Sequence, residues 1–183
     1  MSDHHRNPWK TLATEVVHEN RWYSVRKDTV IMPNGKRGEY HVVDHDDAVF
    51  IVAMDEHENI HLIGLYRYST NMYSVEVPAG GSEGQDPLEA AKRELQEETG
   101  LQAASWELLG KVQSSNGFLN EFAYMYLATN LSATNNHKQA EEGITAHEKI
   151  PLDKVLLMIK FGEITDCQSI AAISLAALRL KKL

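Results

Sequence analysis

Three glutamates, Glu94, Glu97 and Glu98, lie within five positions of the segment RELQEETG (93–100). In a helix each residue turns by about 100°, so Glu94 and Glu98 lie nearly in line and Glu97 lies beside them. A like-charge pair costs about 0.2–0.5 kcal/mol on an exposed helix, which a solvated acidic surface tolerates. Clustered carboxylates are also the oxygen ligands that Mg2+ and Mn2+ prefer. The cluster therefore indicates either a solvated face or a cation site, and the neighbouring elements must decide.

The glutamates lie on a helix with clear start and stop signals. Asp86 is a suitable N-cap, Pro87 fits the first helical position, and Gly100 stands where a left-handed C-terminal residue is needed. The expected buried stripe consists of Leu88, Ala91 and Leu95. This arrangement places Glu94 and Glu98 at the edge of the core.

A glycine-rich loop precedes the helix. The segment VEVPAGGSEGQDP (75–87) reads as a strand that ends in this loop, so backbone carbonyls and carboxylates can converge on a hard cation. A phosphate-binding P-loop is excluded because no GK[ST] follows the glycines, and a dinucleotide-binding loop lacks the G-x-G-x-x-G spacing. The alternating Asp and Asn ligands of an EF-hand are missing as well.

The remaining elements predict a mixed α/β fold. Runs rich in β-branched and aromatic residues indicate strands at 14–19, 22–31, 39–45, 48–54, 60–68, 105–113 and 121–129. Further helices are expected at 152–162, which Gly162 ends, and at 166–182. Few helices separated by blocks of strands suggest a mixed sheet that is covered by helices.

Composition narrows the classes of function. With 183 residues, 43% of them hydrophobic, the chain is long enough for a real core. The net charge of -8, from 18 basic and 26 acidic side chains, argues against binding to nucleic acid or anionic membrane. Cys167 is the only cysteine, which excludes an intrachain disulfide and favours a cytoplasmic location. No segment approaches about 20 uninterrupted apolar residues, so no membrane span is expected.

The segment PAGGSEGQDPLEAAKRELQEETGL (78–101) resembles the Nudix box, whose pattern is G-x5-E-x7-R-E-U-x-E-E-x-G-U with U an aliphatic residue. The second half of the pattern is matched in full by Arg93, Glu94, Leu95, Glu97, Glu98, Gly100 and Leu101. The first half departs from it. Gln85 holds the place of the first glutamate, and only four residues separate Gly80 from Gln85, one fewer than in the pattern.

Looser similarity over about residues 9–178 resembles the ADP-ribose pyrophosphatase branch of the family. The resemblance implies an α/β (α+β) fold, an α/β/α sandwich around a mixed sheet. An N-terminal β segment (1–45) would support a homodimer, and the Nudix hydrolase domain would span 46–183. Members of the branch cleave the diphosphate of ADP-ribose, which would give AMP and ribose 5-phosphate. GDP-mannose or another nucleotide sugar is an alternative substrate, because Asn116 stands where ADP-ribose-preferring members tend to have proline. A non-catalytic nucleotide-sugar-binding module is the alternative that Gln85 suggests.

The resemblance also implies a metal site. Glu94 and Glu98 would be the principal ligands, joined by the backbone carbonyl of Ala79, with Mg2+ as the expected cofactor and Mn2+ as the alternative. Glu97 would bind a further ion or orient its neighbours. Arg93 would hold a carboxylate through a charge-assisted hydrogen bond, and a surface pair with Glu89 is the alternative for it.

The general base and the substrate contacts are implied in the same way. In this branch the base is a glutamate on a mobile loop, and the polar stretch 139–151 offers Glu141 or Glu142 for that role. Arg67 matches an arginine that helps hold the substrate, and Glu76 would pair with such an arginine or touch the substrate. The residue types of Trp22 and Tyr23 suit stacking on a nucleobase across the dimer interface, and packing in the core or the interface is the alternative for them.

Overall fold

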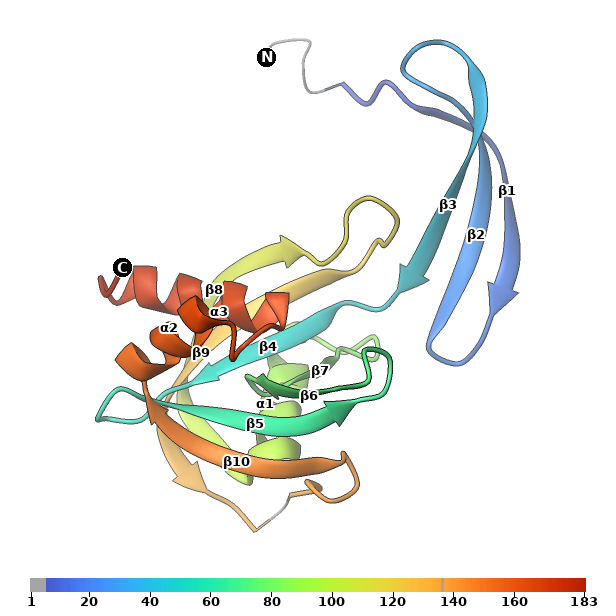
Figure 1. The fold of residues 1–183 in the computed structure, drawn as a ribbon. Coiled ribbons are helices and arrows are strands. Elements are labelled where there is room, and N and C mark those ends of the chain that lie inside the picture. The colour runs from blue at the N-terminus through green and yellow to red at the C-terminus, as the bar shows by residue number, and fades with distance from the viewer. Residues whose placement is uncertain (1–5, 136) are drawn as a thin grey trace. The chain divides into compact units, whose positions relative to one another are not determined.

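The computed structural model describes residues 6–135 and 137–183, which form ten strands and three helices (Figure 1). The chain divides into two compact units. One comprises the described residues up to Asp46 together with Gln113–Glu121, and the other comprises Asp47–Val112 and Phe122–Leu183. None of the helices in the described ranges is long and apolar enough to cross a membrane.

The first unit is an antiparallel sheet of three strands in the order β1-β2-β3. The strands are β1 (Lys10–Glu19), β2 (Tyr23–Ile31) and β3 (Arg37–His45). The turn between β2 and β3 is closed by a hydrogen bond from Gly35 N to Met32 O at 2.8 Å, and Gly35 has a φ of 79°. Every residue of β1 is exposed. This strand therefore has no buried face within the chain.

The second unit contains two sheets. One has the order β7-β4-β9-β8 and the other the order β10-β5-β6. The bounds of the strands of the first sheet are Ala79–Gly81 (β7), Ala48–Ala53 (β4), Phe122–Ala133 (β9) and Leu101–Gln113 (β8). The bounds of those of the second are Ile144–Pro151 (β10), Asn59–Arg67 (β5) and Met72–Glu76 (β6). Because β4 runs parallel to β9 and antiparallel to β7, the sheet is mixed, as predicted.

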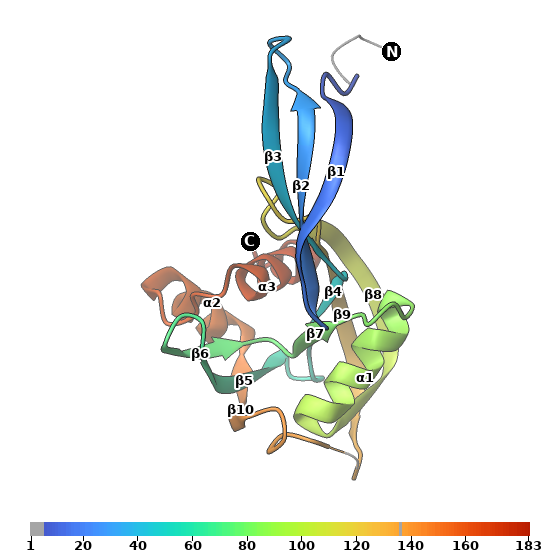
Figure 2. The ribbon, with the colours of Figure 1, turned by 90° about the vertical axis from the view of Figure 1, so that its right-hand side faces the viewer.

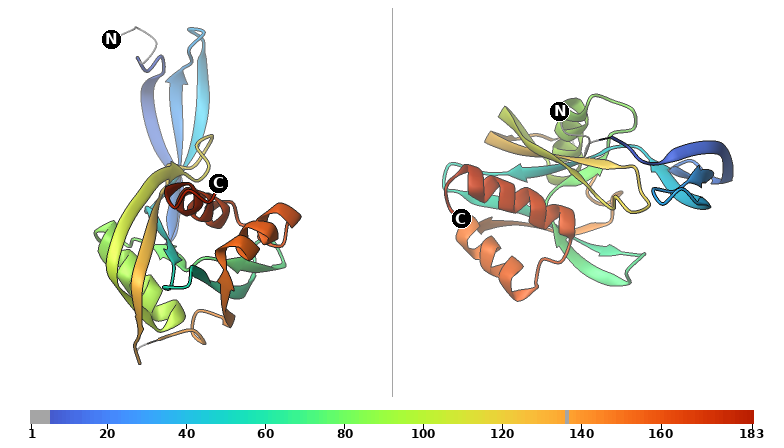
Figure 3. Two further views of the ribbon diagram at one scale, coloured as in Figure 1. Left: turned by 90° about the vertical axis from the view of Figure 1, so that its left-hand side faces the viewer. Right: turned by 90° about the horizontal axis from the view of Figure 1, so that it is seen from above.

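The strand β4 packs against helices on both faces. The helices are α1 (Pro87–Thr99), α2 (Leu152–Phe161) and α3 (Cys167–Arg179). Val49 and Ile51 pack in one core with residues of α1, whereas Val52 packs in a second core with residues of α2 and α3. Figures 2 and 3 show α1 on one side of the β4–β9 pair and α2 and α3 on the other. This burial on both faces explains the continuous apolar run at 48–54, and the predicted α/β fold class is confirmed.

Helix α1 begins and ends where the sequence predicts. The Asp86 carboxylate accepts hydrogen bonds from the N–H groups of Leu88 and Glu89 at 3.0 and 3.3 Å. At the other end Gly100 is left-handed, with a φ of 69°, and its N–H donates to Gln96 O. Glu89 forms an ion pair with Lys92 at 2.7 Å.

One strand lies in a segment that the sequence left as a polar loop. Residues 144–151 form β10, which pairs with β5 at the edge of its sheet. An edge strand has a ladder on one side only, and most residues of β10 are exposed. It therefore carries little of the apolar signal that marks a core strand.

Candidate active site

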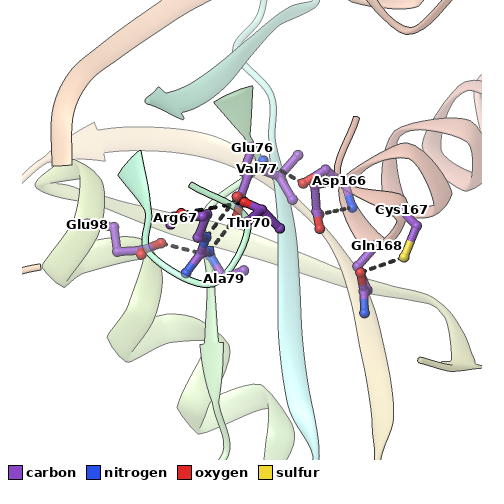
Figure 4. A network of polar contacts seen from close by, with 10 residues as sticks. Arg67, Thr70, Glu76, Val77, Ala79, Glu98, Asp166, Cys167 and Gln168 are labelled. Carbon is purple, nitrogen blue, oxygen red and sulfur yellow. Dashed lines mark hydrogen bonds and ion pairs between the residues drawn. The ribbon is translucent and has the colours of Figure 1, made fainter. Parts of the chain in front are cut away.

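Glu98 lies at the centre of the candidate site, where α1 packs against the start of β7. Its Oε2 accepts a hydrogen bond from the Ala79 N–H at 2.7 Å (Figure 4). The residue is only 6% exposed. Burial raises the pKa of the Glu98 carboxyl to about 8. The hydrogen bond from the Ala79 N–H acts to lower this pKa, and the charges of Glu94 and Glu142 act to raise it. Glu98 is therefore a buried acid that a nearby cation would stabilise in its ionised form.

Glu94 lies one helical turn before Glu98 and is also buried, at 8% exposure. Its Oε1 pairs with Arg93 Nη1 at 2.7 Å, while Arg93 Nη2 donates to the Gly81 carbonyl at 2.9 Å. A Cβ atom on Gly80 would lie 2.2 Å from the Glu94 carboxyl carbon. A side chain at this position would force the Glu94 carboxyl to shift, so the glycine allows the buried carboxylate to lie this close to the backbone.

Glu97 faces a different partner. Its carboxylate forms an ion pair with the Lys138 ammonium and lies 3.4 Å from Arg93 Nη1. The hydrogen bond from Lys138 lowers the pKa of Glu97. Arg93 thus contacts Glu94 and Glu97, whereas Glu89 forms its ion pair with Lys92. The catalytic role of Arg93 remains a prediction.

The three carboxylates of α1 do not converge on one point. Within residues 6–135 and 137–183, no three acidic, histidine or cysteine side chains form a group that could hold a metal ion. Each glutamate has at least one donor: Arg93 pairs with Glu94 and Glu97, Lys138 pairs with Glu97, and the Ala79 N–H donates to Glu98.

The donor set nevertheless fits a hard divalent cation. Glu94 and Glu98 are more than nine-tenths buried, and a buried carboxylate is costly unless it is paired. Oxygen ligands of this kind suit Mg2+ or Mn2+. The predicted contribution of the Ala79 carbonyl remains a prediction, since the contact that the structure records is made by the Ala79 N–H.

Two candidate bases, Glu141 and Glu142, lie in the loop that precedes β10. Both side chains are exposed. The charges of both residues act on Lys138, and the charge of Glu142 also contributes to the raised pKa of Glu94 and Glu98. The assignment of the base to one of these two glutamates remains a prediction.

Arg67 and Glu76 form an ion pair with two hydrogen bonds across the β5–β6 hairpin (Figure 4). Arg67 Nε donates to Glu76 Oε1 at 2.9 Å, and Nη2 donates to Oε2 at 2.5 Å. The Glu76 side chain is 4% exposed and that of Arg67 is 46% exposed. The buried carboxylate thus fixes the arginine and leaves part of the guanidinium free to meet an anion. The charge of Glu98 also acts on Arg67, which places this arginine near the carboxylates of α1.

Trp22 belongs to the first unit and is 63% exposed, with the Arg21 guanidinium 4.0 Å from its ring centroid. Its predicted role in stacking on a nucleobase remains a prediction.

Sequence reasoning missed several residues that shape the site. The motif includes Gly80 but does not show that the Glu94 carboxyl packs against it. Nothing in the local sequence marks Lys138, which pairs with Glu97, or Gln139, whose side-chain amide donates to Glu98 O at 2.9 Å. Ser169 was missed as well: its buried hydroxyl accepts from the Val77 N–H at 3.1 Å and ties α3 to the strand end before the site. The partners of these residues are far away in the chain, so no spacing rule connects them.

Comparisons with known proteins agree with this geometry. Residues 44–166 match the model described as the NUDIX domain, and residues 9–43 match the nucleoside diphosphate sugar hydrolase N-terminal domain. The chain is 33% identical over 179 residues to the ADP-ribose pyrophosphatase of Mycobacterium tuberculosis (strain ATCC 25618 / H37Rv), covering 94% of this chain and 84% of the relative. It is also 33% identical over 166 residues to the methanol dehydrogenase activator of Bacillus methanolicus, covering 90% of each. The crystal structure of an ADP compounds hydrolase shares the fold, with a TM-score of 0.83, 23% identity and 95% of both chains covered.

The chain therefore belongs to the Nudix family, as the motif at 93–101 predicted. Within that family it is similar to the ADP-ribose pyrophosphatase branch, and the predicted enzyme class, a Nudix pyrophosphatase, is confirmed. Nudix hydrolases generally need divalent metal ions, which agrees with the acidic donor set of α1.

Proposed function

We propose that this protein hydrolyses the diphosphate bond of ADP-ribose to AMP and ribose 5-phosphate, with Mg2+ as its cofactor. The observation that carries the proposal is the pair of buried carboxylates, Glu94 and Glu98, together with Arg67, which the buried Glu76 holds in place through two hydrogen bonds. The relatives named ADP-ribose pyrophosphatase support the choice of substrate. A cytoplasmic location is part of the proposal, because Cys167 is the only cysteine in the sequence.

Each site residue then has a role that its surroundings support. Glu94, Glu98 and the Ala79 carbonyl would hold the cation, and Glu97 would complete the set after it separates from Lys138. A divalent cation, when bound, neutralises diphosphate charge and lowers the pKa of bound water. Arg93 keeps Glu94 oriented through its 2.7 Å ion pair.

The substrate and the base complete the mechanism. Arg67 binds a phosphate oxygen with the exposed part of its guanidinium, while Glu76 fixes its orientation. The Glu142 carboxylate accepts a proton from the attacking water, and its exposed loop gives water access to it. Positioning and charge neutralisation supply most of the rate in reactions of this kind.

A homodimer is part of the proposal. All ten residues of β1 are exposed, and Leu12, Val16 and Val17 are large apolar side chains among them. An exposed strand with such side chains is a surface that a second copy would cover. The predicted role of Trp22 in base stacking belongs to the same arrangement. The division into an N-terminal β segment, 1–45, and a Nudix domain, 46–183, is proposed with it.

A substrate panel tests the proposal. Purified protein is incubated with Mg2+ or Mn2+ and with ADP-ribose, GDP-mannose, NADH or dinucleoside polyphosphates, and the products are identified by chromatography. AMP released fastest from ADP-ribose is the expected result. Faster cleavage of GDP-mannose would identify GDP-mannose as the preferred substrate and would leave the proposed reaction, hydrolysis of the diphosphate bond, unchanged.

The second candidate is a nucleotide-sugar-binding module that does not cleave its ligand. It is favoured by one observation: Gln85, in the loop before α1, replaces the first glutamate of the motif. Calorimetric binding of ADP-ribose with no product at any metal concentration would support this module and contradict the hydrolase.

A further inference from the structure

The last turn of α1 is capped by residues from a distant loop. The final carbonyl groups of a helix have no partner within the helix. Here the Lys138 N–H donates to Glu97 O at 2.7 Å, and the Gln139 side-chain amide donates to Glu98 O at 2.9 Å. The last turn of α1 contains no basic residue of its own, so the Lys138 ammonium supplies the positive charge that a helix C-terminus favours.

The same two residues begin the turn that carries the candidate bases, here called the 138–143 loop. The Lys138 carbonyl accepts from the N–H groups of Glu141 and Glu142 at 2.8 and 3.1 Å. The Gln139 carbonyl accepts from the Ile144 N–H at 2.9 Å. The loop is therefore a closed turn, with Gln139 at its base.

Both ends of the 138–143 loop are tied to other elements. On the far side, Ile144 begins β10 and pairs with Leu65 of β5. On the near side the side chain of Gln139, which is half-buried, holds the loop to the backbone of Glu98. The residue whose carbonyl is held, Glu98, is the same residue whose carboxylate lies at the centre of the site.

We propose that Gln139 is a positioning residue for hydrolysis, because its amide fixes the 138–143 loop, and with it Glu142, relative to Glu94 and Glu98. The inference rests on the proposed function. A backbone carbonyl in a helix is a rigid anchor, so one hydrogen bond to it restricts how far the loop can move away from the carboxylates. A displacement of about 1 Å in a catalytic group can cost as much as a hundredfold in rate.

The test is the Gln139→Met variant, which keeps the length of the side chain and removes its donor. The matched control is Gln102→Met on β8, where the amide of Gln102 donates to Ser132 Oγ at 3.1 Å and not to a carbonyl of α1. For each variant, kcat and KM for ADP-ribose are measured with Mg2+, together with the Kd for Mn2+ by electron paramagnetic resonance. Hydrogen–deuterium exchange is followed over 138–144 and over α1.

For Gln139→Met we expect kcat to fall about tenfold or more, while KM and the Mn2+ Kd change less than about threefold. Exchange should become faster in the 138–143 loop and stay unchanged in the first turns of α1. The control should match the wild type in all four measurements. A residue that merely supports the fold would alter Mn2+ binding and α1 exchange as well.

Two results would overturn the inference: an unchanged kcat with unchanged loop exchange, or a kcat that falls in proportion to Mn2+ affinity. Failure of the proposed function looks different. It would appear as a wild-type protein that does not cleave ADP-ribose, or as a Glu142→Gln variant with full activity. In that case hydrogen–deuterium exchange in the Gln139→Met variant would still show whether Gln139 holds the 138–143 loop to α1. Unchanged exchange in this variant would contradict that role of Gln139.

Discussion

The side chains of Glu94 and Glu98 are buried where α1 packs against Ala79 and Gly80. Glu98 is 6% exposed with one backbone donor, and the Glu94 carboxyl lies where a side chain on Gly80 would displace it. A neighbouring glutamate on the same helix, Glu89, has a side chain that is 64% exposed and pairs with Lys92. Substitutions of the buried Glu98 and of the exposed Glu89 can therefore be compared on the same helix.

Replacing Glu98 with glutamine should separate activity from stability. The amide oxygen can still accept from the Ala79 N–H, and a neutral amide replaces a carboxyl whose pKa burial raises to about 8, so the metal-free variant should unfold at the same or a higher temperature. Hydrolysis should fall by at least about a hundredfold, because a cation ligand is lost. Circular dichroism and product assays measure the two effects.

Glu89→Gln is the control for this change. An exposed ion pair contributes at most about 1 kcal/mol, so this variant should keep wild-type activity and nearly wild-type stability. Full activity in Glu98→Gln would contradict the assignment of Glu98 as a metal ligand.

Helix α1 depends on its N-cap. The Asp86→Ala variant removes the acceptor for the N–H groups of Leu88 and Glu89 and should lower the free energy of unfolding by about 1 kcal/mol. Urea unfolding measures the change. Asp86→Ser keeps an acceptor at the same position and should restore most of the stability. An unchanged free energy of unfolding in Asp86→Ala would show that the cap contributes little.

The strands β5 and β10 are joined by a histidine pair, with His61 Nδ1 3.0 Å from His147 Nε2. Burial lowers the pKa of His61 to about 4, with His147 and Lys149 adding to the shift and Asp55 opposing it. The unfolded chain, with its ordinary value of 6.5, binds the proton first. The stabilising contribution is therefore complete above pH 6.5 and is lost as the pH falls toward 4.

Replacing His61 with glutamine should flatten this dependence. Between pH 7 and pH 4.5 the wild type should lose about 1 kcal/mol more stability than His61→Gln, after solvent screening is taken into account. Urea unfolding at several pH values gives the comparison, with His57→Gln, whose side chain is 72% exposed, as the control. Parallel curves for the wild type and His61→Gln would refute the linkage.

For the molecule as a whole, the exposed strand β1 predicts association. Stable dimers typically bury about 1,600 Å2 in total, and the exposed apolar side chains of β1 would form part of such an interface. Light scattering should therefore give twice the chain mass of 20.6 kDa at micromolar concentration. Replacing Val16 and Val17 together with glutamate should give the monomer, while Glu39→Lys on the exposed part of β3 should remain dimeric. A wild-type monomer at high concentration would contradict the dimer.

Local spacing was enough to predict the elements that carry the chemistry. The caps of α1, the ordering of Glu94, Glu97 and Glu98 on one arc, and the glycine loop before them follow from rules that act over a few residues. Helices near 152–162 and 166–182 were also predicted, and α2 and α3 confirm them. The edge strand β10 was not predicted, because its polar sequence is typical of a loop and its strand conformation depends on pairing with β5.

The sequence by itself determined the class of this protein, because the charged residues of its motif lie on one helix. The period and the caps of that helix depend only on residues close together in the sequence. Only the tertiary structure decided how those residues are held. It showed that Glu76 is the partner of Arg67, that Lys138 pairs with Glu97, and that Gln139 caps α1. The physical reason is that burial and hydrogen bonding act between residues that folding brings together, and no spacing along the chain encodes those distances.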